Sequence, residues 1–195
     1  MIPRYRLLWL VLSLAILCAA CGPGNTVRLI PPPALSGQSL PAPNAPSICV
    51  VNFEDERSDE FSVGVRRDGS AFTTNQNVSE WISRALADEL ARDGLRVTYA
   101  VSVAQARSGN PDYLVTGRVD NVWLKEDGRL QLTSSMRVNL ALANRKGRIW
   151  SETCNSSETK AGLPSKGWAD DLLLSTLKDL IKPIAQKIVQ TVNKK

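Results

Sequence analysis

The residues best suited to chemistry lie in one acidic run. Five carboxylates and Arg57 lie between Glu54 and Glu60, and two further arginines follow closely. Paired carboxylates can act as general acid and base or help to bind calcium. Neither use has supporting spacing, because the chain has no Asp-x-Asp-x-Asp-Gly loop. The run predicts an ion-paired, solvated loop or, alternatively, a partner-binding loop made by Asp55, Arg57, Arg66 and Arg67.

The chain contains no histidine. This excludes His general bases, His-activated nucleophiles and nearly every zinc site. No glycine-rich phosphate loop is present either. We therefore expect no catalytic residues, no metal and no cofactor. An enzyme acting on cell-wall glycan through Asp/Glu pairs is the weakest hypothesis, because it needs two carboxylates roughly 5–10 Å apart in a cleft. The net charge of +5 is spread along the chain, which gives no case for a nucleic-acid partner.

The N-terminus has the pattern of an export signal. Arg4 and Arg6 precede an apolar run from Leu7 to Leu17, and Cys18-Ala-Ala-Cys21-Gly22 follows. A charged segment, a short apolar segment and small residues are typical of a cleaved signal. The Cys after Ala-Ala resembles a bacterial lipoprotein signal. We predict a signal at 1–20 and lipidation of Cys21; an ordinary cleaved signal and an uncleaved anchor helix are the alternatives.

Several acyl chains on one Cys give stable membrane anchoring. In lipoproteins that this signal resembles, Asp at the position of Gly22 favours retention in the inner membrane. Because this position is Gly, we expect a lipid-anchored, periplasm-facing outer-membrane protein rather than an inner-membrane one. Residues 21–46 are expected to be the lipidated Cys and a linker, because seven of the eleven prolines lie at 22–46. Such a segment is stiff and extended and would hold the periplasmic domain, 47–195, tens of Å from the bilayer.

Two cysteines remain in the expected domain, Cys49 and Cys154. In an oxidising compartment they could form a disulfide, which would stabilise the fold by roughly 2–4 kcal/mol. Alternatively, both are small buried residues on neighbouring strands.

Apolar periodicity predicts most of the elements. A buried strand at 48–53 precedes a long polar segment in which Asp68-Gly69 marks a short hairpin, with arms at 62–66 and 70–74. A helix is expected from Asn77 to Asp93, capped by Asn77, and a short strand at 95–99. After a brief helical turn at 101–107 come two strands within 113–143, a strand at 148–154, a polar loop at 155–166 and a helix at about 168–193.

The strands within 113–143 predict a hairpin around Asp127-Gly128. Pairing Glu126 with Arg129 places Trp123 opposite Leu132 and polar Asn121 opposite Ser134. A polar spot under the sheet could also belong to a ligand groove between sheet and helices, formed by Asn121, Trp123, Ser134 and Met136. The resulting fold class is α+β, a mainly antiparallel sheet with two helices on one face, in the order β-loop-α-β-β-β-β-α.

Several short motifs lie along the chain: the strand 48–53 with Asp55-Glu56-Arg57, then Gly64, Arg66 and Gly69, the Trp81 helix with Leu86-Ala-Asp-Glu-Leu90, Val115-Thr-Gly117 and Arg148-Ile-Trp-Ser151. Together these motifs resemble the YajG-like lipoproteins. The resemblance covers roughly 48–192, and the wider group includes auxiliary lipoproteins of ABC-type transport systems. It implies a lipid-anchored accessory protein without known catalytic residues.

The leading hypothesis is a non-enzymatic envelope lipoprotein that binds a partner protein or assembly at the membrane. The alternative is a lipid or small-ligand carrier, an auxiliary component of an ABC-type transporter, with an apolar cavity near Val119, Trp123 and Met136.

Overall fold

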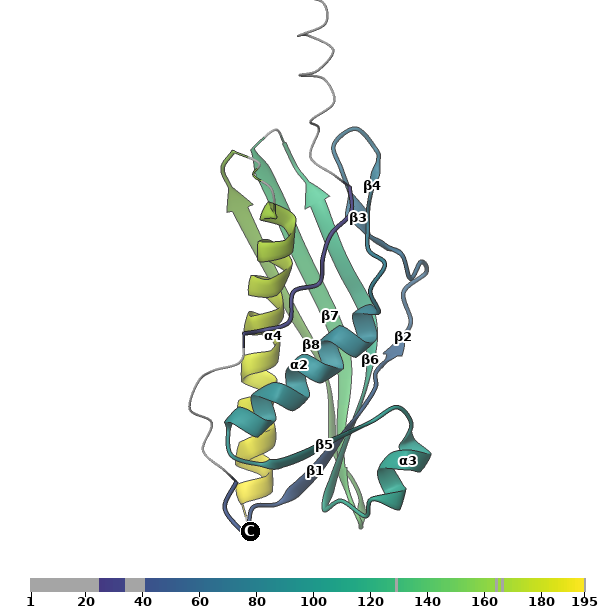
Figure 1. Cartoon of the computed structure of the whole chain (residues 1–195), viewed down its shortest axis with the longest axis vertical. Helices are drawn as coiled ribbons and strands as arrows, with labels where there is room; N and C mark the ends of the chain where they lie inside the picture. The colour runs from purple at the N-terminus through teal and green to yellow at the C-terminus, as the bar shows by residue number, and fades with distance from the viewer. Residues whose placement is uncertain (1–24, 34–40, 129, 164, 166, 195) are drawn as a thin grey trace, which may run out of the picture.

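A computed structural model describes residues 25–33, 41–128, 130–163, 165 and 167–194. The predicted signal, Cys21 and part of the predicted linker lie outside these residues. A three-stranded antiparallel meander dominates the fold (Figure 1). Strand β6 (Tyr113–Glu126) pairs with β7 (Gln131–Asn144), which pairs with β8 (Gly147–Ala161).

Shorter strands extend the sheet beyond β6. Strand β1 (Ser47–Val51) runs parallel between β6 and β5 (Arg96–Ala100). Strands β2 (Glu54–Asp55) and β3 (Ser62–Val65) also pair parallel with β6, and β4 (Ala71–Thr73) forms the predicted short hairpin with β3.

Two helices cover one face of this sheet, as predicted. Helix α2 (Val78–Arg92) begins at Asn77, whose side chain accepts a hydrogen bond from the Glu80 N–H. Helix α4 (Trp168–Asn193) continues through Pro183. Their apolar stripes close one large core with the inner side chains of β6 and β7, because each element exposes one apolar face that must be buried. The α+β fold class is therefore confirmed.

The short helix α3 (Val103–Ser108) packs on the opposite face of the sheet. Its Ala106 contacts a small cluster that includes Cys49. Since neighbouring residues of a strand point to opposite faces, Cys49 faces away from the main core that Ile48 enters. Cys154 of β8 packs against the main core instead.

The predicted Cys49–Cys154 disulfide is therefore wrong in this structure, where both thiols are free. The two side chains lie on different faces of the sheet, which no bridge can span. Burial raises the pKa of the Cys154 thiol, and the neighbouring Glu152 carboxylate raises it further. A raised pKa keeps this thiol protonated and unreactive at neutral pH.

Part of the predicted linker belongs to the folded domain. We call residues 25–33 the strap. Its Val27 and Leu29 are only 2% exposed and belong to the main core. The strap pairs with β4 through the bridge between Thr26 and Thr73 and then crosses α4 (Figure 1). The expectation of a free tether is thus wrong for this stretch.

Hydrogen bonds fasten the strap to both helices. The Trp81 indole N–H of α2 donates to the Ile30 carbonyl at 2.9 Å. Asp170 of α4, a largely buried carboxylate, accepts from both the backbone N–H and the side chain of Arg28. The strap therefore packs against both helices through buried side chains and hydrogen bonds, as a regular element would.

The register of the predicted hairpin needs correction. Glu126 lies opposite Leu132 rather than Arg129, so five residues instead of two lie between the paired positions. A β-bulge at Asp120 then shifts the pairing by one, so that Val119 faces Val138. A bulge reverses which side chains of one strand point inward. Val122 and Leu124 therefore enter the core above it, whereas Val115 and Val119 do so below it.

Candidate functional site

Strand β8 is exposed along most of its length. It runs for 15 residues along the rim of the meander and pairs only with β7; within the described residues no strand lies on its other side. The sequence predicts that this strand ends at Cys154 and that 155–166 is a loop. The structure continues it to Ala161, with Asn155 opposite Arg137 and Thr159 opposite Thr133.

The face of the meander that α2 and α4 leave uncovered is polar. Its side chains form hydrogen-bonded rows from strand to strand. Asn139 of β7 donates to the Asp120 carboxylate of β6 at 2.6 Å and accepts from Thr153 of β8. Thr133 and Thr159 lie 3.0 Å apart in a second row. Small uncharged side chains thus cover the outer side of β8.

A shallow depression of about 430 Å³ lies on this uncovered face. Arg118 and Glu56 form an ion pair of 2.9 Å near it. The residues that line the depression come from β2, β6, β7 and β8: Glu54, Thr116, Gly117, Arg118, Asn139, Leu140, Ala141, Arg148, Ser151, Glu152 and Thr153. Its mixed charges and hydroxyls suit a polar protein surface rather than an apolar ligand, because small-molecule sites are mostly apolar and enclosed.

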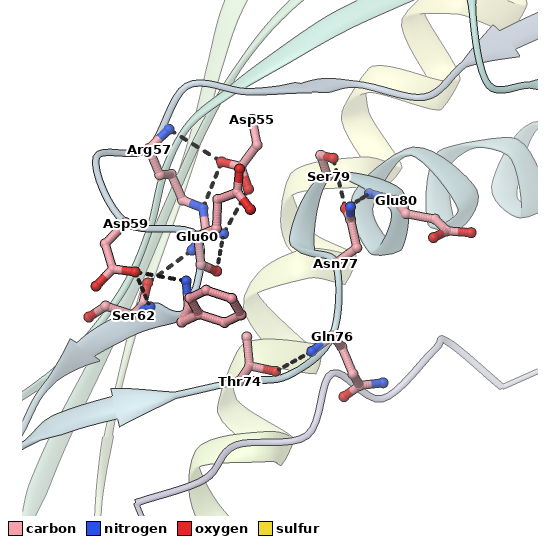
Figure 2. Close-up of polar contacts among 11 residues, drawn as sticks. Asp55, Arg57, Asp59, Glu60, Ser62, Thr74, Gln76, Asn77, Ser79 and Glu80 are labelled. Carbon is pink, nitrogen blue, oxygen red and sulfur yellow. Dashed lines mark hydrogen bonds and ion pairs between the residues drawn. The ribbon is translucent and has the colours of Figure 1, made fainter.

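The predicted partner-binding loop uses its charges internally. Figure 2 shows the Arg57 guanidinium held by the Asp55 carboxylate and by a main-chain carbonyl. Nε and one terminal nitrogen of Arg57 contact Asp55 at 2.9 and 2.7 Å. The same terminal nitrogen also donates to the Glu60 carbonyl, and the other terminal nitrogen donates to the Ser62 carbonyl. The two side chains are only 6% and 13% exposed. This pair shapes the loop and presents little surface to a partner.

Arg66 and Arg67 lie together at the turn between β3 and β4. The Arg66 guanidinium contacts the Glu126 carboxylate at 3.0 Å and the Asn25 side chain at 2.8 Å. Arg67 donates its backbone N–H to the same carboxylate, and its side chain stays exposed. The four predicted loop residues therefore form two separate groups in the structure. Asp55 lies with Arg57, and Arg66 lies with Arg67.

Replacing Arg57 with Ala is expected to lower the free energy of unfolding by about 2–3 kcal/mol, because it leaves the shielded Asp55 carboxylate without its ion pair. Arg57→Lys should recover only part of this, since an ammonium cannot reproduce the forked contact. Urea denaturation of both variants measures the difference. Arg84→Ala, which removes an exposed pair with Glu80, is the control and should cost less than about 1 kcal/mol. Equal stability of the Arg57→Ala and Arg84→Ala variants would contradict the structural role.

The predicted ligand groove is not assembled. Ser134 and Met136 are buried on the helix-covered side, at 0% and 1% exposed. Trp123 is 38% exposed, opposite Ser135 on the outer face, and Asn121 donates to the Ser135 hydroxyl at 3.2 Å. The four residues thus lie on two faces, because the bulge at Asp120 turned Asn121 and Trp123 outward.

Among the described residues, no group of three or more His, Cys, Asp or Glu side chains is placed to hold a metal ion. Within the same residues, no helix has the length and apolar character needed to cross a membrane. The feature that sequence reasoning missed is the long free edge of β8. The alternation of Trp150, Glu152, Cys154 and Ser156 on its half-buried side was the signal available in the sequence.

No model of a known protein family matches the chain, and no curated protein matches it either. Solved structures do resemble it. Protein XCC0632 from Xanthomonas campestris, a DUF330 protein, has a TM-score of 0.50 and 12% identity over 87% of this chain and 97% of that one. At this identity the likeness shows a shared fold.

Two weaker resemblances are to proteins of other bacteria. A PelC dodecamer from Paraburkholderia phytofirmans has a TM-score of 0.45 and 16% identity, over 76% of this chain and 94% of that one. Lipoprotein GNA1162 from Neisseria meningitidis has a TM-score of 0.41 and 17% identity, over 72% and 99%. One of these three proteins is a lipoprotein. The resemblance of this chain to YajG-like proteins stays a prediction.

Proposed function

We propose that the chain is a non-enzymatic lipoprotein of the bacterial envelope, anchored through Cys21 in the outer membrane, whose domain binds a protein along the free edge of β8. The observation that carries the proposal is the length of that edge. Strand β8 has 15 residues, and in the described part of the chain no second strand pairs with it on the side away from β7. The partner would add an extended strand, a mode of binding in which main-chain hydrogen bonds supply much of the affinity.

Proteins usually protect such edges. Short strands, prolines, lysines and bulges prevent unwanted pairing of exposed N–H and C=O groups. Strand β8 has no proline, and its single lysine, Lys160, stands one residue from its end. Glu152 is paired with Lys187 of α4, so its charge is turned away from the outer face. The outer side chains between Ser151 and Thr159 are uncharged, as an interface for another strand requires.

Anchoring is supported by the sequence signal before Cys21. The alternative, a lipid carrier, needs an apolar cavity near Val119, Trp123 and Met136. Val119 and Met136 are packed in the core while Trp123 lies on the other face, so these three residues do not line one cavity. No observation on the described residues favours the carrier over the accessory protein.

The double variant Ser151→Lys/Asn155→Lys tests the edge. Both side chains are exposed on the outer side of β8, so stability should change by less than about 0.5 kcal/mol for each substitution. Two lysines on the edge should reduce co-purification of the partner from detergent-solubilised envelopes at least tenfold. Asp88→Lys on the exposed side of α2 is the matched control, because it makes the same change in net charge. Unchanged co-purification, or equal loss in both variants, would contradict the proposal.

A further inference from the structure

One end of the domain gathers two turns and the end of a strand. They are the β3–β4 turn at 66–70, the β6–β7 turn, and the end of β8 at 161–163, all at the top of Figure 1. Hydrogen bonds link neighbouring turns directly. The Gly162 N–H donates to the Leu130 carbonyl at 2.8 Å, and the Arg67 N–H donates to the Glu126 carboxylate. We call this surface the turn end.

The strap begins at this same end. The Thr73 N–H donates to the Asn25 carbonyl at 2.9 Å, and Arg66 donates to the Asn25 side chain at 2.8 Å. Cys21 precedes Asn25 by four residues, and four residues span at most about 14 Å even when fully extended. A lipid on Cys21 therefore leaves the turn end no room to move far from the bilayer.

Exposed leucines occur at this end. Leu163 is 82% exposed, the highest value among the exposed large apolar residues of the described chain, and Leu130 beside it is 51% exposed. Two of the cations around them are paired: Arg66 contacts Glu126 at 3.0 Å, and Lys125 contacts Asp127 at 2.6 Å. Arg67 and Lys160 are exposed at the same end and can attract anionic headgroups at low salt. The gain of the leucines from a membrane comes from apolar burial and does not depend on salt.

We propose that the turn end rests on the bilayer surface, with Leu130 and Leu163 entering the boundary between headgroups and acyl chains. The inference rests on the lipidation of Cys21 in the proposed function. It fixes the orientation of the domain: β8 and the uncovered face stand roughly upright on the membrane, and the end with α3 points away from it (Figure 1). Contact through leucines rather than cations should persist at high salt, because salt screens charges and leaves apolar burial intact.

The test uses the full mature, acylated chain in vesicles of phosphatidylethanolamine and phosphatidylglycerol that contain a diazirine-bearing phosphatidylethanolamine. After illumination, tryptic peptides are analysed by mass spectrometry. Residues 161–166 carry Leu163, residues 130–137 carry Leu130, and 97–107 carry Val101, which is 72% exposed near α3 at the other end. We expect at least tenfold more lipid adduct on the two leucine peptides than on 97–107, at both low and high salt.

Two variants sharpen the result. Leu130→Asp/Leu163→Asp should lower adduct formation at the turn end at least fivefold, whereas Val101→Asp, the matched control, should leave it unchanged. Equal labelling of all three peptides, or labelling concentrated on 97–107, would overturn the orientation. The mass of the N-terminal peptide separates the two proposals. Missing acyl chains on Cys21 would defeat the proposed function, and acylation without labelling at the turn end would defeat this inference alone.

Discussion

Deletion of residues 22–33 is expected to leave the domain largely unfolded at 25 °C. The deletion removes Val27 and Leu29, each 2% exposed in the core. Burial of such side chains contributes about 1.5–3 kcal/mol each, and the deletion also uncovers Trp81 and the buried Asp170. The total loss, about 5 kcal/mol or more, is comparable with the whole stability of a typical domain. Circular dichroism and urea denaturation of the two chains give the measurement.

Point variants separate packing from chain length. Leu29→Ala should cost about 2–4 kcal/mol, because the cavity left between α2 and α4 cannot close fully. Pro31→Ala, at an exposed position of the same strap, is the control and should change stability by less than about 0.5 kcal/mol. A shortened chain as stable as the full one would show that the strap is a mere tether and would also remove the basis for the short distance between Cys21 and the fold.

Gly64→Ala is expected to cost about 3 kcal/mol or more. Gly64 has a φ of +153°, which side-chain-bearing residues rarely adopt, and it pairs with Leu124 of β6. A Cβ at this position would lie 2.2 Å from the Leu124 carbonyl oxygen. Backbone cannot yield as a flexible side chain can, so the β3–β4 hairpin must move away from β6 and uncover Val63 and Phe72 of the core. Thermal and urea denaturation measure the loss.

Variants at two other glycines separate the cost of the steric clash from the cost of backbone strain. Gly69 also has a positive φ, +85°, but open space around its Cβ position, so Gly69→Ala should cost only about 1 kcal/mol, from backbone strain. Gly128 has open space and no positive φ, and Gly128→Ala should be nearly neutral. If Gly64→Ala cost no more than Gly69→Ala, the close approach of β3 to β6 would be wrong.

Periodicity in the sequence is sufficient for the elements that bury a continuous apolar face. Helix α2 follows from its stripe and from Asn77, and β7 follows from alternate apolar residues between Leu132 and Leu142. In the structure Val138 pairs with Cys154 and Leu142 with Trp150. These features follow from local pattern because side chains on a strand alternate between two faces and those on a helix repeat every ~3.6 residues.

The register of β6 on β7 could not be predicted in the same way. A bulge adds one residue to one strand, and nothing about Asp120 distinguishes it from its polar neighbours. Alternation below the bulge favours Val115 and Val119 inward, and extrapolation beyond it places Trp123 inward as well. The structure exposes Trp123 and buries Val122. The expected ligand groove was a consequence of that extrapolation.

The strap and the second half of β8 were missed for compositional reasons. The burial of Val27 and Leu29 could not be predicted, because two apolar residues two positions apart in a proline-rich segment do not form a recognisable apolar pattern. The strand from Asn155 onwards could not be predicted, because serines and threonines there give no apolar alternation. An edge strand with a solvated face needs little apolar surface. Both segments are defined by what lies next to them in space, α2 and α4 for the strap and β7 for the strand.

Photo-crosslinking from Asn155 in intact cells tests the account most directly. A photoreactive amino acid there projects from the outer side of the β8 edge, and the same group at Asp88 on α2 and at Arg67 on the β3–β4 turn gives matched exposed positions. The account predicts one specific protein, another envelope protein or a second copy of the chain, captured at Asn155 at least ten times more than at Asp88. Capture from Arg67 without capture from Asn155, or equal yields at all three positions, would contradict it.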